Sequence, residues 1–147
     1  MKLADMQEEI RRHLLLSYVI GNATKRATTQ LDEVRSEASC PGWDGYGALP
    51  LDPLACVHAK LFLNTLPTTA PIPEVSADPD GEVALDWDFG ERKALTVSIG
   101  PTGRCTFAWM NGQSTIRGTE WMDDEIPASV AFALSQLARG HQSNQTR

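Results

Sequence analysis

The sequence predicts an α+β domain in which helices precede and follow an antiparallel sheet. The first observation is the stretch Pro73–Trp121, where apolar residues recur at every second position, as in a sheet with one buried face. The second is a set of turn signals within it, Asp80-Gly81, Pro101-Thr102-Gly103 and Asn111-Gly112. The third is helical periodicity on both sides. We therefore expect N-terminal helices, an antiparallel meander of four to five strands, and a C-terminal helix packed on one sheet face.

Length and composition indicate one soluble globular domain. The chain has 147 residues, of which 41% are hydrophobic and 22% are charged. We expect a single domain over residues 1–140, with a helical part at 1–38, and a disordered polar tail at 141–147. Three cysteines, Cys40, Cys56 and Cys105, lie far apart, which argues against a disulfide framework or a structural zinc site. A reducing cytoplasm is the expected setting, and no cofactor is expected.

The charge balance disfavours two classes of partner. The net charge is −6 and the basic residues are scattered, whereas binding to phosphates needs clustered lysine and arginine. Direct nucleic-acid binding is therefore not expected. The apolar run Leu14-Leu15-Leu16 is too short to span a membrane, and Asp5, Glu8 and Glu9 do not fit a secretory signal.

Two N-terminal helices are predicted, separated by a stop signal at Gly21-Asn22. The first covers Leu3–Ile20 and the second runs from Thr28 or Thr29 to Ala38, with Leu31 and Val34 facing inward. The apolar stripe of the first helix consists of Leu3, Met6, Ile10 and Leu14. We expect both helices to pack on the domain. The alternative is that the N-terminal helix docks on a partner or forms a homodimer.

The loop Ser39–Leu51 has the most unusual local composition, with three glycines, two prolines and two large aromatic residues. Under a functional interpretation it is a recognition loop that presents Asp44 between Trp43 and Tyr46. Under a structural interpretation it is a compact plug over the core, in which Asp44 accepts hydrogen bonds from nearby backbone N–H groups. The structural interpretation is favoured from sequence.

A third helix begins at Asp52-Pro53, where Asp is the N-cap and Pro the first helical residue, and Pro67 ends it. Its predicted buried stripe is Leu54, Val57, Leu61 and Phe62, with His58 half-buried beside it. The segment Pro67–Pro73 is predicted to be an extended connector into the sheet.

The sheet has a predicted inner face on three successive strands. It consists of Val83, Leu85 and Trp87, then Leu95, Val97 and Ile99, then Cys105, Phe107 and Trp109. Met110 falls on the opposite face beside Asn111-Gly112 and is expected to be an exposed apolar residue. A final helix over residues 125–140 follows the acidic cluster Asp123–Glu125, which suits the positive end of the helix dipole.

Four aspartates provide the alternative hypothesis of a small hydrolase or metal-dependent enzyme. Asp78 and Asp80 flank the first hairpin turn, and Asp86 and Asp88 share one strand face. On a solvated outer face, water would leave such carboxylates without the desolvation that catalysis uses. The sequence also lacks a G-x-S-x-G motif and a phosphate-binding loop. We therefore expect no catalytic residues and no metal site.

Several short motifs resemble those of a family of small bacterial and phage proteins with no established activity. They are the W-D-G-Y-G-A loop at 43–48, the D-P-D-G-E hairpin at 78–82, and short segments at 66–67, 71–73, 98–101 and 124–127. The resemblance covers Trp43–Leu137 and leaves the N-terminal helices outside it. It implies an intracellular bacterial or phage setting and an accessory gene of a mobile element, and it carries over no functional residues.

The function predicted from sequence is a non-enzymatic protein-binding module. The most concrete form is an inhibitor or neutraliser of another protein: an anti-CRISPR-like anti-defence factor, an antitoxin or an immunity protein. The expected partner-binding residues are aromatic or exposed side chains at two turns, namely Trp43, Asp44, Tyr46, Met110 and Asn111. A homodimeric structural protein joined through the N-terminal helix is a further alternative.

Overall fold

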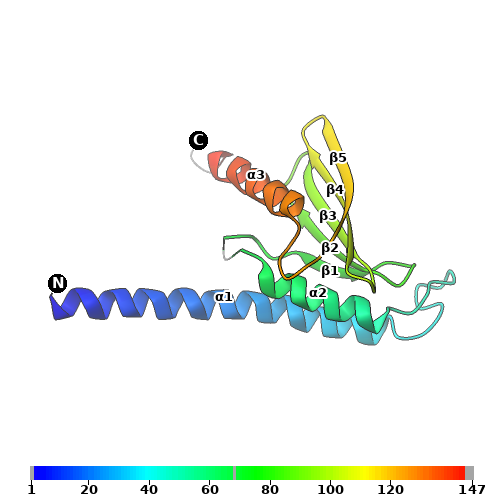
Figure 1. Cartoon of the computed structure of the whole chain (residues 1–147), viewed down its shortest axis with the longest axis horizontal. Helices are drawn as coiled ribbons and strands as arrows, with labels where there is room; N and C mark the ends of the chain where they lie inside the picture. The colour runs from blue at the N-terminus through cyan, green and yellow to red at the C-terminus, as the bar shows by residue number, and fades with distance from the viewer. Residues whose placement is uncertain (1, 68, 145–147) are drawn as a thin grey trace.

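The computed structural model describes the backbone of residues 2–67 and 69–144, and the side chains of these residues except 13, 15–23 and 140–144. Two helices precede a five-stranded sheet and one follows it, so the α+β prediction is confirmed (Figure 1). The elements are α1 (Leu3–Glu37), α2 (Pro53–Thr65), β1 (Glu74–Ala77), β2 (Val83–Asp88), β3 (Lys93–Ile99), β4 (Arg104–Asn111), β5 (Ser114–Trp121) and α3 (Ala128–Asn144). Among the described residues, no helix combines the length and the apolar character needed to cross a membrane.

The sheet is an antiparallel meander in which each strand pairs with the next in sequence. Its register sets Val75 opposite Leu85, Leu85 opposite Val97, and Val97 opposite Phe107. A continuous apolar row therefore crosses four strands on one face. Gly81, in the first turn, has a φ of +91° and so occupies the left-handed region that glycine tolerates best.

The helices cover one face of this sheet. A single core cluster joins the inner-face residues of β1 to β4 with buried residues of α1, α2 and α3. Trp87 and Trp109 belong to this cluster, as predicted for the inner face. On the opposite face, Thr96, Thr106 and Thr119 are exposed to solvent. The sheet thus has one packed face and one open face.

Helix α1 is continuous from Leu3 to Glu37, so the predicted break at Gly21-Asn22 is wrong. Glycine costs a helix only about 1 kcal/mol relative to alanine, and asparagine less. A break would leave orphan backbone groups at two new helix ends. Strong helix formers on both sides therefore carry the helix through the two weak positions.

The N-terminal part of α1, residues 3–14, is called the arm below. Its apolar stripe does not pack on the domain, contrary to prediction: Leu3, Met6, Ile10 and Leu14 are between 46% and 72% exposed. The C-terminal part behaves as predicted, since Leu31 is buried and Val34 packs against the core. Figure 1 shows the arm extending past the end of α2 with no other element beside it.

Helix α2 begins as predicted but presents a different face to the core. The Asp52 carboxylate accepts a hydrogen bond from the Leu54 N–H at 2.8 Å, and Pro53 is the first helical residue. Of the predicted buried stripe only Phe62 is buried, whereas Leu54, Val57 and Leu61 are 49% to 59% exposed. The buried face consists of Ala55, Cys56, Ala59, Phe62 and Leu63. Helix α2 lies between α1 and the sheet, where small alanines allow close approach and larger side chains would not fit.

Helix α3 begins at Ala128, after Pro127, whose carbonyl accepts hydrogen bonds from the Val130 and Ala131 N–H groups at 3.0 Å. Val130, Ala133, Leu134 and Leu137 are buried as predicted, and Ile126 packs against the core just before the helix. The helix continues beyond Gly140 to Asn144, and residues 145–147 lie outside the described residues.

Candidate functional site

The loop between α1 and α2 is held by its own side chains. One oxygen of Asp44 accepts hydrogen bonds from the Tyr46 N–H at 2.8 Å and the Ala48 N–H at 3.0 Å. These two bonds favour the ionised carboxylate and lower its pKa. The Trp43 indole N–H donates to the Leu49 carbonyl at 2.9 Å, and the ring packs against the core. Asp44 therefore makes the backbone contacts that the structural interpretation of the loop predicts.

Tyr46 has a different environment from Trp43, since it is 95% exposed. It lies between Gly45 and Gly47, which have φ values of +82° and +90°. The loop thus buries one of its aromatic side chains in part and presents the other to solvent. An exposed aromatic ring on a constrained backbone is the kind of side chain that anchors protein interfaces.

The loop is fastened to one end of the sheet. The Leu49 N–H donates to the Pro79 carbonyl at 2.8 Å, and the Asp52 N–H donates to the Gly81 carbonyl at 2.9 Å. A Cβ atom on Gly81 would lie 3.0 Å from the Pro50 carbonyl oxygen, so a larger residue would crowd this contact. The β1–β2 turn therefore fixes where Tyr46 is presented.

Met110 and Asn111 lie at the other end of the sheet. Met110 is 39% exposed and Asn111 is also exposed, at the turn between β4 and β5. The Gly112 N–H donates to the Arg92 carbonyl at 2.7 Å, which ties this turn to the β2–β3 turn. Because successive turns of a meander alternate between ends, the β1–β2 and β4–β5 turns lie at opposite ends (Figure 1). The five predicted partner-binding residues therefore form two separate surfaces.

The four aspartates of the enzyme hypothesis also fall into two groups. In the first, Asp80 accepts a hydrogen bond from the Glu82 N–H at 3.0 Å, and Asp78 lies beside Ser98. The Ser98 hydroxyl lies 2.7 Å from a carboxylate oxygen of Asp78 and 2.7 Å from one of Glu82. Burial, followed by the charges of Asp80 and Glu82, raises the pKa of Asp78. A hydroxyl has one proton, so protonation of Asp78 allows both contacts to be hydrogen bonds.

The second group lies further along β2. Asp86 accepts a hydrogen bond from the Thr96 hydroxyl at 2.6 Å, and Asp88 accepts one from the Gly90 N–H at 2.9 Å. The Asp86–Thr96 bond links β2 to β3, and the Asp88–Gly90 bond lies in the β2–β3 turn, so both have structural roles. Within the described residues, no group of three or more His, Cys, Asp or Glu side chains is placed to hold a metal ion.

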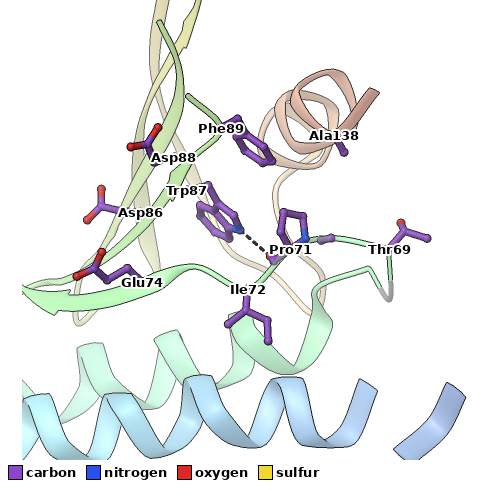
Figure 2. Close-up of a pocket in the computed structure, with 10 residues that line it drawn as sticks. Thr69, Pro71, Ile72, Glu74, Asp86, Trp87, Asp88, Phe89 and Ala138 are labelled. Atoms are coloured by element: carbon purple, nitrogen blue, oxygen red, sulfur yellow. Dashed lines mark hydrogen bonds between the residues drawn. The ribbon is translucent and has the colours of Figure 1, made fainter. Parts of the chain in front are cut away.

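A pocket of about 560 Å³ opens beside β2, a size within the range for small-molecule sites (Figure 2). Figure 2 shows Trp87, Phe89, Pro71 and Ile72 around the opening, with Ala138 of α3 above it. The Trp87 indole N–H donates to the Pro71 carbonyl at 2.8 Å, which holds the connector against the ring.

Three acidic residues, Glu74, Asp86 and Asp88, also line the pocket. Figure 2 shows them pointing to the opposite side of the sheet from Trp87. Glu74 and Asp86 lie directly opposite each other in the register, and β2 continues past the end of β1 to Asp88. The carboxylates are therefore separated by the sheet from the aromatic side of the pocket. Sequence reasoning missed the pocket because it depends on how α3 and the Pro67–Pro73 connector meet β2.

No protein-family model, curated protein or solved structure matches the chain.

Proposed function

We propose that the protein is a non-enzymatic, cytoplasmic protein-binding module that inhibits or neutralises another protein. In biological terms this is an anti-CRISPR-like anti-defence factor, an antitoxin or an immunity protein. The observation that carries the proposal is Tyr46, which is 95% exposed on a loop whose backbone is fixed by Asp44 and Trp43.

A tyrosine in this position supports tight binding for two reasons. Its ring offers a large contact area with few rotatable bonds, so little side-chain entropy is lost on binding. The loop backbone is already ordered by the Asp44 and Trp43 hydrogen bonds, so association does not have to order it. Met110 and Asn111 provide a second contact surface, and a partner that contacts both must extend along the sheet.

The test is an affinity pull-down of the tagged protein from its host, read by mass spectrometry and by an assay for co-purified nucleic acid. We expect one protein in near-stoichiometric amount, and expect Tyr46→Ala to weaken its binding at least tenfold, as for interface anchors worth about 2 kcal/mol. Phe132→Ala is the matched control, because it removes an exposed aromatic ring from α3. If Tyr46→Ala and Met110→Asp both leave binding intact, the proposed surfaces are wrong.

The exposed stripe of the arm favours a second candidate, a homodimer formed through α1. One helical face of the arm carries Leu3, Met6, Ile10 and Leu14. Met6 is 46% exposed, and the other three are more than half exposed. Isolated helices of this length are marginal in water, and burial of an apolar face is what usually stabilises them. Light scattering coupled to size exclusion tests this candidate, since a mass equal to one chain at all accessible concentrations contradicts it.

A further inference from the structure

Two exposed apolar stripes with the same spacing occur on this chain. On the arm, Leu3, Met6 and Ile10 follow one another at intervals of three and four residues. On α2, Leu54, Val57 and Leu61 have the same intervals. Spacing of this kind places side chains on one helical face and is the a-d-a pattern of paired helices. The least exposed of the six, Met6, is still 46% exposed.

The arm cannot reach α2 of its own chain. The loop between the two helices is short in space, because the Leu51 N–H donates to the Ala38 carbonyl at 2.9 Å. Helix α2 therefore starts beside the C-terminal end of α1 and runs back along it, as Figure 1 shows. The arm lies further along the same continuous helix, past the end of α2. Contact between the two stripes within one chain would require α1 to fold back on itself, so such a contact needs a second molecule.

We propose that the arm of one chain packs on α2 of a second copy of this chain, and that the exchange is reciprocal. The arm of each copy reaches α2 of the other only if the two-fold axis is perpendicular to α1, which makes the two α1 helices antiparallel. Because α2 is antiparallel to its own α1, the arm of one copy then runs parallel to α2 of the other. This direction matches the two stripes residue by residue: Leu3 with Leu54, Met6 with Val57, and Ile10 with Leu61.

Reciprocal exchange covers more of the exposed apolar side chains than pairing of the two arms alone. Arm-to-arm pairing covers one stripe per chain and leaves Leu54, Val57 and Leu61 in water. Exchange covers both stripes of both chains in two equivalent contacts, which closes the assembly at two copies. Contiguous exposed apolar side chains are a common feature of protein interaction sites. The inference rests on the homodimer candidate above and specifies its geometry.

Disulfide cross-linking tests the geometry on the full chain. Cys40 is the exposed native cysteine, so both variants carry Cys40→Ser. One chain also carries Met6→Cys and the other Val57→Cys. We expect a disulfide between the two chains when they are mixed and oxidised, and little cross-linking of either variant with itself. Non-reducing gels and mass spectrometry of the linked peptides identify the bond.

The outcomes distinguish the existence of a homodimer from its formation by reciprocal exchange. A monomer in light scattering overturns both the homodimer and the exchange. A dimer in which Met6→Cys cross-links with itself overturns the exchange alone and supports pairing of the two arms. A dimer with no cross-link at position 6 also overturns the exchange and leaves the homodimer in place.

Single charged substitutions give an independent measurement. Met6→Asp and Val57→Asp should each weaken dimerisation more than about tenfold, because each buries a charge in the proposed apolar contact. Both positions are solvent-exposed in one chain, so the helical signal and the melting temperature of the separated chain should stay close to native. Ile116→Asp is the matched control, since Ile116 is an exposed apolar residue of β5, outside both stripes, and should leave the dimer unchanged. Dimerisation that survives both Met6→Asp and Val57→Asp overturns the proposal.

Discussion

The two ends of helix α1 carry the same kind of apolar periodicity and have opposite environments. Ala27, Leu31 and Ala38 are buried against α2 and the sheet. Leu3, Ile10 and Leu14 are more than half exposed, although they too recur at helical spacing. The pattern shows which face of a helix is apolar, because it depends only on the helical repeat. What covers that face depends on how far the rest of the chain extends, and here the domain ends before the helix does.

The first prediction tests this contrast directly. Leu31→Ala leaves a cavity in the core and should lower the free energy of unfolding by about 2–5 kcal/mol. Ile10→Ala removes a side chain that is exposed in the single chain and should change the free energy of unfolding by less than about 0.5 kcal/mol. Urea unfolding, at concentrations low enough for the single chain, gives both values. Similar losses for the two variants would mean that the arm packs on its own domain.

The second prediction concerns Gly21, which lies between the two ends of α1. If α1 is continuous, Gly21→Ala should stabilise it by up to about 1 kcal/mol and raise the helical circular dichroism signal. If the chain instead turned at Gly21 in a left-handed conformation, alanine would be strained there and the helical signal would fall. The sign of the change therefore distinguishes one helix from two. Lys25→Ala, within the same helix, is the control for a simple gain in helix propensity.

The smallest expected effect is a dependence of folding stability on pH, which arises near the C-terminal end of α1. The loop that follows α1 is bonded to the β1–β2 turn next to Asp78, whose pKa is raised by burial and by neighbouring carboxylates. A carboxyl with a raised pKa in the folded state binds more protons there than when unfolded, so its contribution to stability falls as pH rises. The fall begins near the ordinary value of 3.8 and ends above the raised pKa.

Asp78→Asn keeps an oxygen for the Ser98 hydroxyl and removes this titration. The stability of Asp78→Asn relative to the native chain should therefore increase as pH rises from below 3.8 and then level off. Urea unfolding across a pH series measures the difference. The exposed Asp124→Asn variant is the control and should give a difference with a weaker dependence on pH. A difference that falls with rising pH would contradict the assignment.

Much of the fold could be predicted because it depends on local chemistry. Alternation in β2 to β4 identified the inner face, and Asp80-Gly81 and Asn111-Gly112 located two of the turns. The Asp52-Pro53 start of α2 follows from the capping requirement of a helix N-terminus. Such features involve residues close in sequence, so a single amino-acid sequence is sufficient to find them.

The errors occurred where the choice depends on distant residues. On α2, both the Leu54/Val57/Leu61 face and the Ala55/Ala59 face are apolar, and contact with α1 and the sheet selected the one with smaller side chains. At Gly21-Asn22, two weak helix positions were outweighed by the cooperativity of the flanking turns.

For the candidate site, the chemistry of the Trp43–Tyr46 loop and the glycines that let it turn can be read from the amino-acid order. Packing of distant elements sets Trp43 against the core while Tyr46 faces solvent, and places Met110 at the opposite end of the sheet. The same packing brings β2, α3 and the proline-rich connector together around a pocket. Side-chain chemistry is local, whereas exposure and proximity are set by the contacts between elements far apart in the chain.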